Sequence, residues 1–163
     1  MKRIVIAGLF GAAALAAALQ TDAAAEQAPA SAAKAGYAPG LGEFMLATQT
    51  RHAKLWFAGN VQNWDLADYE IDELKEGLED VVKHIPVFKD IPIGKMIESI
   101  MDSPIENVEK AIKAKDRAKF VAAYDKLTEA CNSCHQSASR PFIVIQRPAT
   151  SAFPNQNFNP GRK

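Results

Sequence analysis

Two cysteines and a histidine near the end of the chain form a motif that could do chemistry. The stretch Cys131-Asn132-Ser133-Cys134-His135 is a CxxCH, and its two cysteines are the only ones in the sequence. In this arrangement the two thiols can add across the vinyl groups of a haem, and the histidine that follows can ligate the iron. The motif therefore predicts one covalently attached haem c, bound through Cys131 and Cys134, with His135 as an axial ligand.

Two other interpretations of the cysteines stay open. A thiol–disulfide redox centre has its CxxC at the start of a helix, in a fold that alternates strands and helices. Here the motif ends a long predicted helix in a chain without strand patterns. A zinc site would need two further ligands. His52 and His84 could be proposed for that role, but nothing in the sequence pairs them.

The first 25 residues have the pattern of a secretory signal peptide. Residues 1–3 are Met-Lys-Arg, residues 4–19 are apolar and Ala-rich, and residues 23–25 are three alanines that suit a signal peptidase. We predict cleavage after Ala25 and export to a bacterial periplasm. The alternative is a membrane anchor, but the apolar run is short for a span of about 20 residues. We therefore expect no membrane span after cleavage.

Length, charge and composition narrow the class of protein. The 163 residues suit one domain of ordinary size. The chain has 19 basic and 19 acidic residues, and loss of the signal peptide leaves 17 and 18, so there is no basic surplus for binding nucleic acid. An apolar content of 48% is too high for a disordered chain.

The rest of the chain divides into a leader, a helical bundle and a tail. Residues 26–40 are rich in Ala, Pro, Gly and Ser and predict a flexible leader. Apolar residues then recur with helical spacing over four stretches, which are about 41–60, 64–85, 93–114 and 116–140. They predict an all-α, antiparallel four-helix bundle of up-down-up-down topology over residues 41–140, followed by an extended C-terminal tail over 141–163.

Single residues indicate where these helices begin, end or break. Gly59 is expected to stop the first helix. Asp65 and Asp116 are expected to cap the second and the fourth. The run 103–106, Ser-Pro-Ile-Glu, has the features of a helix start inside the third stretch. We therefore expect a kink there, or two helices end to end.

Helix faces and the tail carry further expectations. The acidic side chains of the second helix, Glu70 among them, should form a solvated face. Phe153 and Phe158 could anchor the tail on the bundle. Trp56 and Phe57 are adjacent and so face different directions. One of them could lie at a contact between two copies, which leaves a homodimer open, or they could pack in the core.

The last predicted helix resembles that of a known family. Ahead of the CxxCH it carries an acidic cap and three apolar or aromatic residues, Asp116, Phe120, Tyr124 and Leu127. The stretch 111–135 is similar to the final helix of the class II c-type cytochromes, the cytochrome c-prime group, which form four-helix bundles. The resemblance implies either a high-spin haem with an open iron face or a low-spin haem with a Met ligand from the first helix. The chain departs from the family after the motif, where only Arg140 is comparable to the family's aromatic–basic pair.

A second iron ligand would have to come from upstream, because no Met or His follows His135. In an up-down bundle the first and fourth helices are adjacent and antiparallel. At about 1.5 Å per residue, His135 lies about 28 Å from the start of the fourth helix. Met45 lies about 21 Å and His52 about 10 Å from the matching end of the first helix. Met45 is therefore the preferred ligand. An open face, His52 and the third-helix residues Met96 and Met101 are the alternatives.

These patterns favour an electron carrier over an enzyme. With His135 and Met45 as ligands, the reduction potential is raised and small ligands are excluded, which suits one-electron transfer with a redox partner protein in the periplasm. The alternative is a five-coordinate protein that binds NO or CO at an open iron face. A peroxidase-like site is a third hypothesis, for which His52 is the only hint. The side chains that could pair with haem propionates are Arg51, Lys54 and Arg140.

Overall fold

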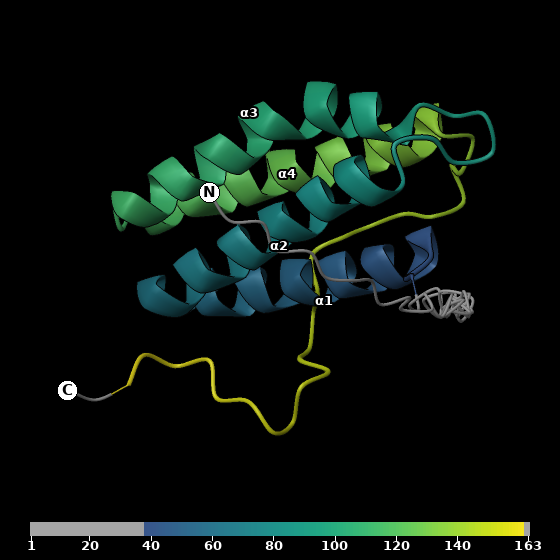
Figure 1. The fold of residues 1–163 in the computed structure, drawn as a ribbon. Helices are drawn as coiled ribbons and strands as arrows, with labels where there is room; N and C mark the ends of the chain where they lie inside the picture. Colours follow the sequence, from purple (N-terminus) through teal and green to yellow (C-terminus); the bar gives the residue numbers. More distant parts are fainter. Residues whose placement is uncertain (1–37, 162–163) are drawn as a thin grey trace, which may run out of the picture. The chain divides into compact units, whose positions relative to one another are not determined.

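The structure is a computed structural model, and it describes residues 38–161. Four helices follow one another there, α1 Leu41–Asn60, α2 Trp64–His84, α3 Ile93–Lys113 and α4 Arg117–Ser137. Each helix packs against the next, and α1 also contacts α4 (Figure 1). The described residues form no strand, only one isolated bridge between Phe88 and Ile91. The predicted four-helix bundle is confirmed, whereas the predicted signal peptide and nearly all of the predicted leader lie outside the described residues.

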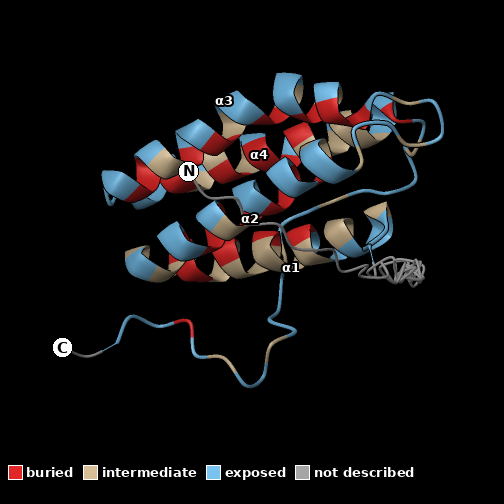
Figure 2. Ribbon diagram, in the orientation of Figure 1, coloured by how far each residue is buried: buried red, intermediate tan, exposed pale blue. Residues whose placement is uncertain are grey.

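The core is built from apolar stripes that face one another across the helices. Its largest fully buried side chains are Leu55, Ile71, Leu74, Val81, Val108, Phe120, Tyr124 and Leu127. Because these residues recur at helical spacing, each helix turns one face inward, and Figure 2 shows buried bands alternating with exposed ones along the helices. None of the helices within residues 38–161 is long and apolar enough to cross a membrane.

The N-terminal caps of α2 and α4 are side-chain hydrogen bonds. Asp116 caps α4 as predicted, because its carboxylate accepts the backbone N–H of Lys119 at 3.0 Å. The prediction of Asp65 as the cap of α2 is wrong. Asn63 occupies that position, and its side-chain oxygen accepts the backbone N–H of Leu66 at 3.4 Å. An amide can cap with its oxygen and still donate with its nitrogen, and Asn63 uses that nitrogen to bind the tail.

Gly59 has a packing role and does not stop α1. The helix runs on to Asn60, and the left-handed conformation that follows it belongs to Gln62, with φ of 62°. A Cβ atom at Gly59 would lie 2.1 Å from the Cζ atom of Phe120. The absence of a side chain at Gly59 therefore lets Phe120 of α4 pack directly on the backbone of α1.

The proline motif does not divide the third helix. α3 is a single helix with Pro104 inside it, so the alternative of two helices end to end is wrong, and the kink stays a prediction. Buried Met101, Ile105 and Val108 continue one apolar stripe across the proline. Packing of that stripe holds the helix together despite the hydrogen bond that proline cannot donate.

Glu70 departs from the solvated face predicted for α2. The residue is only 3% exposed. Burial raises the pKa of its carboxyl group, and the positive charge of Lys54 opposes that rise. The neighbouring Glu73 pairs with Arg51 of α1 at 2.9 Å. Part of the acidic face of α2 thus meets basic side chains of α1 instead of solvent.

The C-terminal tail packs on the bundle. It leaves the end of α4 and runs back toward α1 (Figure 1). Phe158 is buried, with its ring centre 5.3 Å from that of Phe57, and its carbonyl accepts the side-chain N–H of Asn63 at 3.1 Å. The Phe153 ring centre lies 6.2 Å from that of Phe158. Both phenylalanines therefore anchor the tail, as predicted.

Candidate functional site

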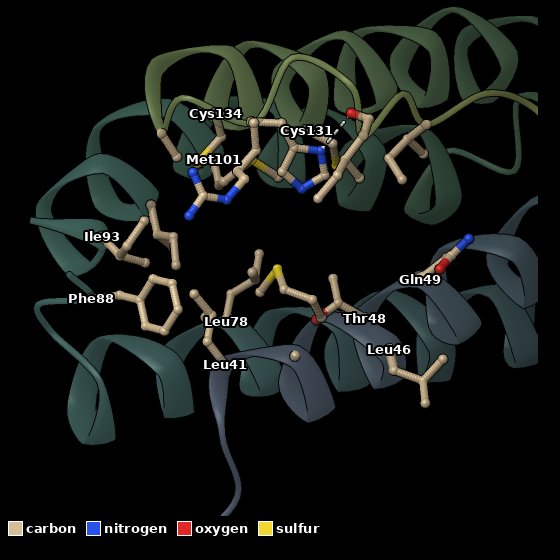
Figure 3. Close-up of a pocket in the computed structure, with 18 of the residues that line it drawn as sticks. Leu41, Leu46, Thr48, Gln49, Leu78, Phe88, Ile93, Met101, Cys131 and Cys134 are labelled. Carbon is tan, nitrogen blue, oxygen red and sulfur yellow. Dashed lines mark hydrogen bonds between the residues drawn. The ribbon is translucent and has the colours of Figure 1, made fainter. Parts of the chain in front are cut away.

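A cavity of about 450 Å³ lies beside the C-terminal end of α4. Its lining is mostly apolar and comes from all four helices, the loop over 86–92 and the start of the tail (Figure 3). A cavity of this size is ordinary for a site that binds a small molecule or cofactor. The four residues predicted from the sequence to hold the cofactor line it together, namely Met45, Cys131, Cys134 and His135.

Two facing walls of the cavity carry sulfur. Figure 3 shows Cys131, Cys134 and Met101 on the wall formed by α3 and α4, and Thr48 of α1 across from them. Met45 belongs to the α1 wall, because it precedes Thr48 by less than one helical turn and also lines the cavity. A planar group held by the cysteines would therefore have a thioether on the opposite wall.

The two cysteines are free thiols and do not form a disulfide. They lie three residues apart in α4 and so share one helix face. Burial raises the pKa of the Cys131 thiol to about 12, with a further contribution from the charge of Cys134, whose own pKa is also raised by burial. Both groups are therefore neutral thiols near neutral pH.

The tail fixes the ring of His135. Its Nδ1 atom lies 3.1 Å from the backbone carbonyl oxygen of Ile143. A carbonyl can only accept, so this hydrogen bond places the ring proton on Nδ1 and leaves the lone pair on Nε2. Histidines that ligate metals commonly use one nitrogen for the metal and donate from the other in this way. The neutral tautomer that the hydrogen bond selects is the one suited to ligation through Nε2.

His52 lines the same cavity, but both of its ring nitrogens have hydrogen-bond partners. The Thr128 hydroxyl lies 3.0 Å from Nε2 of His52 and donates to the carbonyl of Tyr124 at 2.9 Å. The Tyr124 hydroxyl lies 2.9 Å from Nδ1 and donates to the backbone carbonyl of His52 at 3.0 Å. Burial lowers the pKa of His52 to about 4, so the ring is neutral near pH 7. His52 has the environment of a satisfied core histidine.

Met96, another alternative ligand, does not line the cavity.

Of the three basic residues considered for propionates, Arg140 alone lines the cavity. Arg51 pairs with Glu73, and the Lys54 ammonium lies 5.3 Å from the ring centre of Phe153. Both are engaged with other elements, whereas the guanidinium of Arg140 donates to the adjacent carbonyl of Ser139 at 2.9 Å. The structure thus brings one of the three candidates to the site.

Trp56 and Phe57 are covered by the chain's own tail. The guanidinium of Arg147 lies 4.6 Å from the ring centre of Trp56, and Phe158 contacts Phe57. Sequence analysis missed this covering, and it missed Ile143 and Ile145 as lining residues of the cavity. The available signal was the apolar run six residues after the motif, in which those two residues alternate with Phe142 and Val144.

The zinc alternative finds no further ligands at the cysteines. Within residues 38–161, no three His, Cys, Asp or Glu side chains come together in a group that could hold a metal ion. His84 is exposed at the end of α2 and pairs with Asp80 at 3.8 Å.

Among known proteins, no family model, no curated protein and no solved structure matches this chain.

Proposed function

We propose that the protein is a c-type cytochrome that carries single electrons, with one haem c in the cavity beside the end of α4. The observation that carries the proposal is the shared position of Cys131, Cys134 and His135 on one wall of an apolar cavity. Two free thiols and a histidine with an available Nε2 are the donor set that this attachment needs. The residues present therefore fit the group.

The cysteines supply the covalent attachment. Cys131 and Cys134 would each hold the haem through a thioether, in which the sulfur is bonded to one vinyl carbon and the thiol hydrogen to the other. No electrons are lost, and the reaction needs both cysteines as thiols. Cys131 and Cys134 meet this requirement, because both are free and burial keeps them protonated.

The remaining residues of the cavity hold and shield the site. His135, whose Nδ1 is hydrogen-bonded to Ile143, would ligate the iron through Nε2 from the α4 side, and Met45 would offer its thioether from the α1 side. Apolar walls exclude water, which strengthens the electrostatic interactions inside. When bound, the haem supplies a one-electron iron couple, and His/Met ligation raises its potential. We propose that the protein works in the periplasm with a redox partner protein.

Covalent attachment is tested by producing the full chain together with haem-maturation machinery. The native protein should gain the mass of one haem and retain it after denaturation in acid and organic solvent. The double variant Cys131→Ser, Cys134→Ser should gain none. A native chain that folds in the presence of that machinery and carries no covalent haem would contradict the proposed function.

The second ligand is tested by optical spectra. The oxidised native protein should show a low-spin spectrum with a Met-to-iron charge-transfer band. Met45→Ala should abolish the band, and Met96→Ala, outside the cavity, should leave it unchanged. A high-spin native spectrum that shifts readily with CO would instead favour the gas-binding alternative.

A further inference from the structure

The start of the tail forms a strap across the last turns of α4. We use the name tail strap for residues 143–147, which are neither helix nor turn. Ile143 and Ile145 line the cavity, and the Ile143 carbonyl accepts the Nδ1–H of His135. The orientation of the His135 ring therefore depends on where the tail strap lies.

One side chain of the CxxCH motif holds the tail strap in place. The side-chain N–H of Asn132 donates to the carbonyl of Ile145 at 2.9 Å, and the backbone N–H of Ile145 donates to the Asn132 side-chain oxygen at 2.7 Å. The amide thus satisfies both backbone polar groups of one tail residue, as a neighbouring strand would. Only an amide side chain carries an N–H donor and a carbonyl acceptor side by side, and the only other residue that has one is Gln, which is longer.

The spacing of these contacts links Asn132 to His135. The two residues are three apart in α4 and lie on the same face of the helix. Their partners, Ile145 and Ile143, are two apart, and alternate residues of an extended segment face the same side. The backbone N–H of Ile143 also donates to the carbonyl of Arg140 at 3.0 Å. This bond holds the start of the tail strap and the Asn132 pair holds its middle, and together they present the Ile143 carbonyl to His135.

An outer anchor prevents the tail strap from sliding. The Nε–H of Arg147 donates to one carboxylate oxygen of Asp125 at 2.7 Å, and a second guanidinium nitrogen donates to the other oxygen. The same guanidinium lies over the ring of Trp56. A paired and stacked arginine holds one position better than a single flexible ion pair does.

We propose that Asn132 is a positioning residue for the iron ligand, acting through the tail strap to fix the tautomer and the orientation of His135. This inference rests on the proposed function. A hydrogen bond from Nδ1–H to a carbonyl makes the imidazole a more basic ligand. A more basic ligand stabilises oxidised iron, so loss of Asn132 should raise the reduction potential.

The first measurement uses the full chain without haem. In the native chain, NMR should find the His135 proton on Nδ1, and the amide of Ile145 should be protected from hydrogen exchange. Asn132→Ala should speed exchange at Ile145 and move the His135 proton toward Nε2. Ser133→Ala is the matched control, since the Ser133 hydroxyl is exposed and donates to the backbone carbonyl of Glu129 within α4 at 2.9 Å.

The second measurement uses the haem-loaded chain. Asn132→Ala should shift the reduction potential upward, and Ser133→Ala should leave it unchanged. If Asn132→Ala does not fold, Ile145→Pro removes the N–H from the tail side of the same pair and should give the same shift. Unchanged exchange, tautomer and potential in these variants would overturn the proposal. A chain that takes up no haem would overturn the proposed function instead, and the haem-free measurement would still decide whether Asn132 holds the tail strap.

Discussion

The Nδ1 atom of His52 lies 2.9 Å from the hydroxyl oxygen of Tyr124, and the two rings stack with centres 4.5 Å apart. This pair joins α1 to α4 in the interior, next to the cavity. Thr128 completes it, so that all ring nitrogens and hydroxyl groups of the three side chains are satisfied. The pair is both a wall of the site and a polar link inside the core, and its loss should be visible in stability.

The pH dependence of stability should report the burial of His52. The folded pKa is about 4 and the unfolded value 6.5, so below pH 6.5 the unfolded chain takes up a proton that the folded chain does not. The stabilising contribution of the neutral ring is complete above pH 6.5. As the pH falls toward 4, the free energy of unfolding decreases by about 3 kcal/mol. Chemical denaturation of the native chain and His52→Gln across this range measures the difference. His84→Gln, a change at an exposed histidine, should behave like the native chain. The raised pKa of Glu70 changes stability with pH in the opposite direction. Because Glu70 is present in the native chain and in both variants, its effect cancels in the comparison.

Tyr124→Phe should destabilise the fold more than the lost contact area suggests. It removes the hydroxyl that is hydrogen-bonded to both Nδ1 and the backbone carbonyl of His52 and leaves a buried ring nitrogen without a partner, which costs about 1–3 kcal/mol. Urea unfolding of the variant and the native chain measures the loss of stability. A variant as stable as the native chain would contradict the hydrogen-bond assignment.

Gly59→Ala should be destabilising although alanine favours helices. The added methyl group would meet the Phe120 ring, whose nearest atom lies 2.1 Å from the Cβ position, and overpacking of a core costs about 1–3 kcal/mol. Gly42 is the matched control in the same helix, because a Cβ atom there meets nothing within 4 Å. Gly42→Ala should stabilise α1 by up to about 1 kcal/mol. Thermal unfolding of both variants tests the contrast, and equal effects would refute the packing role.

Removal of the Phe158 ring should detach the end of the tail. Phe158 is buried against Phe57, and truncating a buried phenylalanine costs about 3 kcal/mol. Phe142→Ala is the control, because Phe142 is 77% exposed and its loss should change stability by less than about 0.5 kcal/mol. Limited proteolysis should cleave the tail of Phe158→Ala faster. Equal cleavage of the two variants would argue against an anchoring role.

Local patterns predicted the helices, and they failed where distant residues meet. The apolar stripe that contains Leu55 and the cap at Asp116 each depend on residues close together in the sequence, so both could be predicted from it. The link between His52 and Thr128 joins residues 76 apart, and no local spacing encodes it. Gly59 has the signature of a helix stop, but a ring from another helix explains it. Glu70 is buried because basic side chains of α1 lie beside it.

The residues of the candidate site likewise fall into those that local sequence predicts and those that depend on the fold. The cysteines and His135 are contiguous, so the sequence alone predicts them as a unit. Met45 emerged from counting along two antiparallel helices, a calculation that depends on the topology. The tail strap could not be predicted, since an apolar run of four residues fits several conformations equally well.

The tail also has a consequence for the order of folding. Its contact between Asn63 and Phe158 joins residues 95 apart in sequence. Forming a contact at such separation has a large entropic cost of loop closure, so it tends to form after local contacts. We expect the four helices to gain protection first in pulsed hydrogen exchange. The backbone amide of Gln156, which donates to the Phe153 carbonyl near the Phe158 anchor, should follow, and simultaneous protection would contradict this order. During that interval the Phe57 ring lacks its contact with Phe158, so an apolar part of α1 stays open to other chains until the last segment docks.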